Sequence, residues 1–208
     1  MNNQANITHI EHLPGRFALA RLKLDHAAPG ELVYFTEQNL SLASLPTQQS
    51  NERQLLCMKN QLPAIHTAHN VVLSPLPISP FDIIVGHHNG IAAAISLGKQ
   101  NQSHQPLVLL ATDDEFPFKP VPSSMLVSNM PDGIIAASPL LDDWSIASRL
   151  VSEKPTPGCY HGTAGDLLNE YVSTKKQEDL SICLAGSENF INNVSLNMNK
   201  YRCHFVKL

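Results

Sequence analysis

Residues 74–80, with the sequence SPLPISP, separate two parts of the chain that have different hydrophobic patterns. Three of these seven positions are proline, which has no backbone N–H and is excluded from the interior of a sheet. One continuous sheet therefore cannot run through this segment, and we expect a domain boundary here. The predicted domains are residues 1–76 and residues 81–208.

The N-terminal part contains short stretches in which apolar and polar residues alternate: residues 16–24 (RFALARLKL), 31–36 (ELVYFT), 54–59 (QLLCMK) and 71–73. A period of two predicts antiparallel strands with one buried face. The Ala28-Pro29-Gly30 sequence predicts a hairpin or corner, because proline fixes φ and glycine accepts positive φ. We expect a small antiparallel β-barrel or sandwich.

The C-terminal part alternates continuous apolar runs with helical patterns, which is typical of an open parallel sheet covered by helices on both faces. The fold class predicted for the chain is therefore α/β, with an N-terminal antiparallel barrel and a nucleotide-binding-type parallel-sheet domain. The expected strands are residues 82–86, 106–112, 133–137, 148–151, 180–185 and 202–206, and the expected helices are 91–99, 163–173 and 188–200, with a helix or turn near 140–144.

The charge and hydropathy of the chain exclude several classes of protein. Fourteen basic and 18 acidic residues give a net charge of −4, and no basic stripe is present for binding nucleic acid. The longest apolar runs, such as residues 91–97, are too short to cross a bilayer. The N-terminus lacks a basic segment followed by an apolar one. We expect a cytoplasmic protein with neither a membrane nor a nucleic-acid partner.

The cysteines and histidines do not form a spacing typical of a metal site. The four cysteines include no C-x-x-C pair, which favours buried thiols. The closely spaced histidine pairs supply two ligands each, whereas zinc needs three or four, so no metal site is expected. Cys159 and His161 leave open a thiol nucleophile activated by imidazole. The sequence identifies no catalytic residue.

Three turns follow predicted strands and are candidate ligand-binding segments. The first, GHHNG, spans Gly86 to Gly90 and lets backbone amides and a helix N-terminus approach a phosphate. A tight turn with a purely structural purpose is the alternative. The second turn is Thr112-Asp113-Asp114, and the third is Ala185-Gly186-Ser187. Ligands gather at the carboxyl ends of strands in open α/β sheets, so the three turns are expected to converge. The predicted cofactor-binding residues are Gly86, Asn89, Gly90, Thr112, Asp113, Gly186 and Ser187.

Asp113 lies 23 residues beyond Gly90, near the offset at which an acidic residue binds a ribose hydroxyl. The alternative is that Asp113 and Asp114 cap a solvated loop.

The order of these motifs resembles that of ferredoxin-reductase-like proteins. Residues 82–98 (DIIVGHHNGIAAAISLG) resemble their "GGGIGIAPL" turn and helix, residues 162–168 (GTAGDLL) their "G-x-V-T-D-L-L" segment, and residues 182–190 (ICLAGSENF) their "ACGP-x-x-M" turn. Residues 29–33 (PGELV) resemble the "PGQFV" strand of the flavin-binding barrel. The closest likeness is to the electron-transfer subunit of dihydroorotate dehydrogenase and its bacterial relatives. The resemblance implies a barrel for FAD or FMN, a domain for NAD(P)H and, in some members, a [2Fe–2S] segment.

The chain departs from the family pattern at several cofactor contacts. Residues 40–46 (LSLASLP) lack the arginine of the "R-x-[YF]-S" flavin element, and no "G-x-G-T" turn lies between positions 62 and 72. Asp113 stands where the resemblance implies a basic residue, and Ala185 where it implies a cysteine. The sequence therefore argues against FAD or FMN and leaves NAD(P)H as the cofactor candidate. No [2Fe–2S] cluster is expected, since Cys203 alone cannot replace four thiolates.

Two functions remain open. The first is a diverged ferredoxin-reductase-like oxidoreductase or electron-transfer subunit, related to that of dihydroorotate dehydrogenase and binding a nucleotide. The second is a cofactor-free interaction or regulatory protein on the same fold, because a fold can outlast its original site. The expected partner in either case is a flavoenzyme or another protein.

Overall fold

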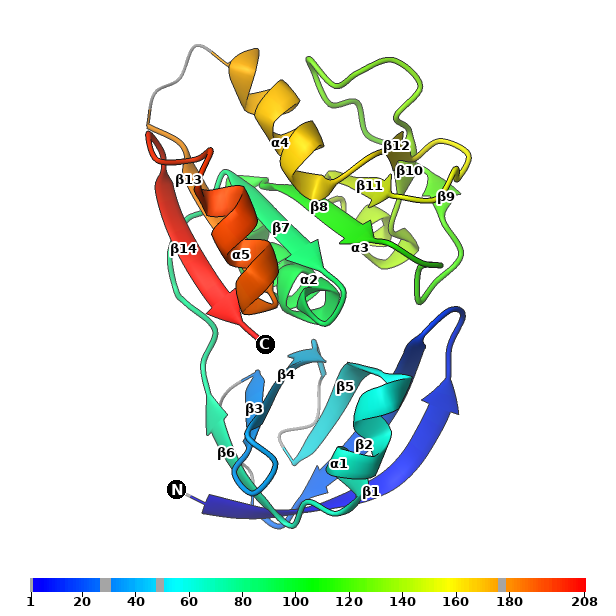
Figure 1. The fold of residues 1–208 in the computed structure, drawn as a ribbon, viewed down its shortest axis with the longest axis vertical. Coiled ribbons are helices and arrows are strands. Elements are labelled where there is room, and N and C mark those ends of the chain that lie inside the picture. Colours follow the sequence, from blue (N-terminus) through cyan, green and yellow to red (C-terminus); the bar gives the residue numbers. More distant parts are fainter. Residues whose placement is uncertain (1, 27–30, 48–50, 176–178) are drawn as a thin grey trace.

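The computed structural model describes residues 2–26, 31–47, 51–175 and 179–208, which form a β-barrel and an α/β domain (Figure 1). The proline-rich segment lies between the last barrel strand, β6 (Asn70–Ser74), and the first strand of the parallel sheet, β7 (Ile83–His87). Among the described residues, no helix is both long and apolar enough to span a membrane.

The N-terminal strands form a closed antiparallel barrel in the order β1-β2-β5-β4-β3-β6. The first strand, β1, pairs with both β2 and β6 and so closes the barrel. Closure decides between the two architectures that alternation left open, in favour of a barrel. Besides β6, the barrel strands are β1 (Asn2–His12), β2 (Phe17–Leu24), β3 (Leu32–Phe35), β4 (Leu40–Leu45) and β5 (Glu52–Met58).

Two barrel strands were not expected from the sequence. β1 is rich in polar residues, and Ala5 is a buried side chain within it, so it carries little hydrophobic pattern. It is held by a long backbone ladder along β2 from Ala5 to His12. The second is β4, whose residues resemble the position of a flavin element and form a barrel strand. A short 3-10 helix, η1 (Lys59–Gln61), and α1 (Leu62–His66) connect β5 to β6, and the predicted Ala28-Pro29-Gly30 turn lies outside the described residues.

The α/β domain contains a six-stranded sheet in the order β12-β11-β8-β7-β13-β14, and all its pairs are parallel. This arrangement confirms the predicted open parallel sheet. The strands after β7 are β8 (Leu107–Thr112), β11 (Ser148–Ser152), β12 (Tyr160–His161), β13 (Ser181–Gly186) and β14 (Arg202–Lys207).

Helices cover both faces of this sheet (Figure 1). On one face lie α2 (Gly90–Gln100) and α3 (Pro139–Asp143), whose buried side chains join one core cluster. On the other lie α4 (Ala164–Ser173) and α5 (Glu188–Ser195), which contribute to a second cluster. A 3-10 turn, η2 (Gln102–His104), follows α2. The buried strands between the two layers explain the continuous apolar runs in the sequence.

Two expected elements of the α/β domain differ in the structure. The strand predicted at residues 133–137 shrinks to β10 (Ala136–Ala137), which pairs antiparallel with β9 (Val121–Pro122) outside the parallel sheet. Ile135 is 54% exposed, so the GIIAA run is only partly buried. The helix predicted at residues 188–200 ends at Ser195. The chain continues in tighter i→i−3 turns, in which Asn197 N donates to the Val194 carbonyl oxygen and Met198 N to that of Ser195.

The two domains share one continuous apolar core. The cluster that contains Ile91 and Ile95 of α2 also contains Phe17, Ala43 and Leu56 of the barrel. A buried hydrogen bond, from the Ser96 hydroxyl of α2 to the Ser44 carbonyl oxygen of β4, crosses the seam between the two domains. These contacts hold the carboxyl ends of the parallel strands beside the β1–β2 hairpin of the barrel.

Candidate functional site

The three predicted turns lie side by side at one edge of the parallel sheet. β7 is paired with β8 on one side and with β13 on the other. Gly86 lies opposite Leu110 of β8 and Ala185 of β13, so all three strands end at the same level. The convergence of the turns is therefore as expected, although it does not by itself identify a ligand.

The glycines of the first turn are required by close packing. A Cβ atom at Gly90 would lie 1.9 Å from the carbonyl oxygen of Ala185, and one at Gly86 would lie 2.6 Å from the Ala94 Cβ. The N-terminus of α2 is consequently pressed against the end of β13. This close packing supports the interpretation of G-x-x-x-G as a tight turn with a structural purpose. It also places the backbone of the turn next to the edge of the sheet.

A crevice of about 360 Å³ opens at this edge, between α4 and α5. Thr112 and Ser187 are the two predicted residues that line it. Ser187 is also the N-cap of α5, because its Oγ accepts a hydrogen bond from the Phe190 N–H at 3.3 Å. The other predicted residues do not line the crevice: Gly86, Asn89, Gly90, Asp113 and Gly186.

The crevice wall contains a ring stack that sequence reasoning did not identify as part of a site. The His87 ring lies 4.7 Å from the Phe190 ring at an interplanar angle of 14°, and 3.9 Å from the His88 ring. Burial and the neighbouring His88 lower the pKa of His87 to about 4, so its ring is neutral at pH 7. Its Nδ1 has no hydrogen-bond partner among the residues that the structure describes. The neutral His87 ring and the Phe190 ring thus form an uncharged aromatic part of the crevice wall, and the His87 Nδ1 is buried within it.

The remaining wall of the crevice is polar and carries negative charge. Thr163 and Asp166 form a capping box at the start of α4, in which Thr163 N donates to the Asp166 carboxylate at 3.0 Å. That carboxylate has a lowered pKa because the Thr163 hydroxyl and backbone N–H both donate to it. Glu153 and several asparagines complete the lining, which in the described part of the chain includes neither lysine nor arginine.

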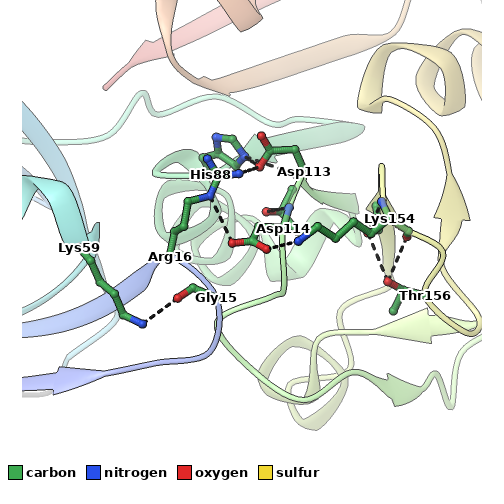
Figure 2. Close-up of polar contacts among 10 residues, drawn as sticks. Gly15, Arg16, Lys59, His88, Asp113, Asp114, Lys154 and Thr156 are labelled. Atoms are coloured by element: carbon green, nitrogen blue, oxygen red, sulfur yellow. Dashed lines mark hydrogen bonds and ion pairs between the residues drawn. The ribbon is translucent and has the colours of Figure 1, made fainter.

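Asp113 and Asp114 do not line the crevice and instead take part in a set of ion pairs (Figure 2). Arg16, from the barrel hairpin, bonds both carboxylates, and its Nε lies 3.2 Å from Asp114. His88 Nε2 lies 2.7 Å from Asp113, and Lys154 Nζ lies 2.5 Å from Asp114. Burial opposes ionisation of Asp113, but Arg16 and His88 outweigh it and lower the pKa of Asp113.

The ion pairs of Asp113 bear on the expectation that this residue binds a ribose hydroxyl. Its carboxylate is paired with cations of this chain rather than presented to a ribose in the crevice. The same pairing means that Asp113 and Asp114 do more than cap a solvated loop, since they connect the two domains.

Comparison with known proteins identifies the fold. No family model and no curated protein matches the sequence. Among solved structures, an Amycolatopsis cytochrome P450 reductase, GcoB, matches 100% of this chain and 69% of its own, with a TM-score of 0.69 at 11% identity. The ferredoxin reductase in carbazole 1,9a-dioxygenase covers the same shares with a TM-score of 0.63 at 11% identity. Phthalate dioxygenase reductase covers 100% and 67%, with a TM-score of 0.57 at 12% identity.

The chain has the ferredoxin-reductase fold. Its barrel and parallel-sheet domain together match 67–69% of the length of those reductases. The low identities establish the fold alone, so the ligands of this chain must be argued from its own residues.

In this ferredoxin-reductase fold, the strand that the sequence resemblance assigned to flavin contact is covered. Residues 42–44 of β4 are buried, and Ser44 is 1% exposed. The Ser96 hydroxyl of α2 donates to the Ser44 carbonyl oxygen at 2.6 Å. Helix α2 therefore packs directly on β4, the strand that corresponds to the flavin element in the sequence resemblance.

The thiols of this reductase-fold chain are poor nucleophiles. Cys57, Cys159 and Cys183 are buried, and burial raises the pKa of Cys159 to about 11. A thiol with that pKa is almost entirely protonated at pH 7, which argues against the Cys159 nucleophile hypothesis. Among the described residues, no group of three or more histidine, cysteine, aspartate or glutamate side chains is arranged to hold a metal ion.

Proposed function

We propose that this chain is a diverged electron-transfer protein of the ferredoxin-reductase fold that binds a nicotinamide nucleotide in the crevice between α4 and α5. The observation that carries the proposal is the convergence of Thr112, Ser187 and the His87–Phe190 stack at the carboxyl ends of β7, β8 and β13. Ligands of open α/β sheets bind at this edge. A planar nicotinamide or adenine ring would lie against the stack, and the asparagines of α5 would meet its polar edge.

The charges of the crevice limit how a phosphate would be held. Glu153 and Asp166 line the wall. Three cations at this end of the sheet already pair with carboxylates of the chain: Arg16 and Lys154 with Asp113 and Asp114, and Lys207 with Glu188. A phosphate would depend on backbone amides at the sheet edge and at helix N-termini. We therefore expect weaker nucleotide binding than a site with an arginine clamp would give.

The sequence resemblance supports a more specific role. The motifs in residues 82–98, 162–168 and 182–190 occur in the order found in the electron-transfer subunit of dihydroorotate dehydrogenase. We propose that this chain is related to that subunit and works with a protein partner, either a flavoenzyme or another acceptor. Solved structures with the same fold include a cytochrome P450 reductase and a ferredoxin reductase of a dioxygenase system.

The proposal is tested by calorimetric titration of the purified chain with NADH and NADPH, together with its absorbance spectrum. Phe190→Ala removes one ring of the stack and should weaken nucleotide binding about 5-fold or more, since an aromatic contact contributes about 1 kcal/mol. Phe205→Ala, which alters a half-exposed ring on β14 outside the crevice lining, is the matched control and should bind as the parent does. Absence of binding by either nucleotide would reject the proposal.

A second function is favoured by the covered β4 strand. With α2 packed on residues 42–44, the chain is suited to a cofactor-free interaction or regulatory role on the same fold. This alternative predicts a colourless protein that gains no stability from FAD, FMN, NADH or NADPH and that forms a defined complex with a flavoenzyme. A bound-flavin absorbance band in the purified chain would count against it.

A further inference from the structure

A second cavity, of about 230 Å³, lies in the seam between the two domains. It shares no lining residue with the crevice between α4 and α5. The barrel contributes one wall from β1, β2, β4 and β5, and the α/β domain contributes the other from α2, the loop after β8 and the start of α3. The lining residues are Glu11, Leu13, Leu19, Leu45, Leu56, Ile91, Ile95, Pro117, Phe118, Ser138, Pro139 and Leu140.

The cavity is apolar except for one hydroxyl and one carboxylate. Ser138 is fully buried, and its Oγ has no hydrogen-bond partner among the described residues. Its backbone is satisfied, because its N–H donates to Ser148 Oγ and its carbonyl oxygen accepts from Asp142 N. Only the side-chain hydroxyl therefore lacks a partner, and a buried polar group without a partner is destabilising.

The size and charge of the cavity restrict what it can hold. A dry cavity of about 150 Å³ lined by leucine, isoleucine and phenylalanine binds benzene, so 230 Å³ suits one substituted ring. Glu11 is exposed and is the charged residue of the described lining, so an anionic ligand would meet like charge. An FMN molecule has three fused rings, which need more space than this cavity offers, and a phosphate, which would meet the like charge of Glu11.

We propose that this seam cavity is a binding site for a small, uncharged, single-ring aromatic molecule that carries one hydroxyl or N–H group. The ring fills the space between Leu19 and Ile95, and its polar group pairs with the Ser138 hydroxyl, which can both donate and accept. Because the two walls belong to different domains, the ligand stabilises their packing. The site does not depend on nucleotide binding in the crevice.

Thermal unfolding and ligand-observed NMR of the full chain test this site with three probes: phenol, toluene and benzoate. Phenol and toluene have nearly the same shape, but only phenol can pair with Ser138. We expect phenol to bind roughly 3- to 10-fold more tightly than toluene, the ratio for one hydrogen bond. At about five times its dissociation constant, phenol should raise Tm by about 2–4 °C. Benzoate should bind more weakly than phenol.

Four variants distinguish ligand binding in this cavity from general effects on stability. Ser138→Ala should remove the preference for phenol over toluene and leave the fold intact. Leu19→Trp, from a half-buried strand position, should fill the cavity and abolish the phenol shift, and Leu140→Phe does so from the opposite wall if the first variant does not fold. Leu196→Trp, at a 70% exposed position outside the lining, is the control.

Several results would overturn the proposal: no phenol shift in the parent chain, equal binding of phenol and toluene, or an unchanged phenol shift in a folded cavity-filling variant. Tighter binding of riboflavin or FMN than of phenol would also reject it in favour of a flavin site. Titration with NADH reports separately on the crevice, so failure of one site is distinguishable from failure of the other.

Discussion

At the scale of single residues, the sheet edge is shaped by close packing around the first turn of α2. Gly90 allows the first turn of α2 to contact the carbonyl group of Ala185, and His87 is held neutral between two rings. Both residues belong to the GHHNG turn. The turn therefore has a packing role that is independent of any ligand.

Replacing Gly90 with alanine should destabilise the protein by at least about 2 kcal/mol, because the added Cβ overlaps backbone that cannot move without shifting β13. Chemical denaturation measures the change. Gly165→Ala in α4 is the control, since its Cβ would meet its nearest neighbour at 3.5 Å and alanine is the better helix former. Equal stability of the two variants would contradict the packing role of Gly90.

His87 should make folding stability depend on pH in a defined window. Its folded pKa of about 4 lies below its ordinary value of 6.5, so the unfolded state binds more protons between these values. The stability is fully present above pH 6.5 and is lost as the pH falls toward 4, by up to about 3 kcal/mol. His87→Phe should flatten this slope in urea titrations from pH 7 to pH 4. His69→Phe, at an exposed barrel position, should keep the parent slope.

At the scale of elements, local sequence signals account for how the crevice helices begin. Thr163 and Asp166 exchange hydrogen bonds at the start of α4, and Ser187 caps α5. The caps fix the two helices at the crevice rim by pairing backbone N–H groups that helices otherwise leave free. Strand β1 is the opposite case, because it forms by pairing with β2 rather than from a pattern of its own.

Thr163→Ala should lower the free energy of unfolding by about 1 kcal/mol, the usual effect of losing an N-cap hydroxyl. Guanidinium denaturation followed by circular dichroism measures it. Ser173→Ala, at an exposed position in the last turn of the same helix, should stay within about 0.5 kcal/mol of the parent. A neutral Thr163→Ala would mean that tertiary packing alone sets the start of α4.

At the scale of the whole molecule, the two domains are joined by an apolar core and by charged pairs at its edge. The buried bond from Ser96 to Ser44 lies within the seam, and Arg16 reaches from the barrel to Asp113 and Asp114 (Figure 2). The apolar contacts contribute most of the association, since exposed ion pairs are weak. The charged pairs mainly fix orientation.

A double-mutant cycle of Arg16→Gln and Asp113→Asn should give a coupling free energy of about 0.5 kcal/mol that shrinks as salt is raised. Arg16 is half exposed, which limits the effect. Arg202→Gln with Asp179→Asn provides a matched cycle on a more exposed pair, which should couple less strongly. A larger coupling for Arg16 that persists in 1 M salt would show that the pair is effectively buried.

The sequence by itself determined the order of elements in the α/β domain. Continuous apolar runs at residues 82–86, 106–112 and 180–185 predicted buried parallel strands, because strands covered on both faces need no polar side. The same pattern predicted that the three turns after these strands lie at one edge of the sheet. It did not predict β1, because this strand is rich in polar residues and is held by its backbone ladder to β2. It also predicted the helix that ends at Ser195 to be five residues longer than it is.

Only the tertiary structure decided which turn residues line the crevice and which face the barrel. Asp113 follows a predicted strand just as Thr112 does, yet its carboxylate turns to Arg16, which lies 97 residues away in sequence. Phe190 stacks on His87, and Ser138 lines a cavity built from both domains, through contacts that no local pattern encodes. Periodicity reports which face of an element is buried, but the partner of each side chain depends on how the two domains pack.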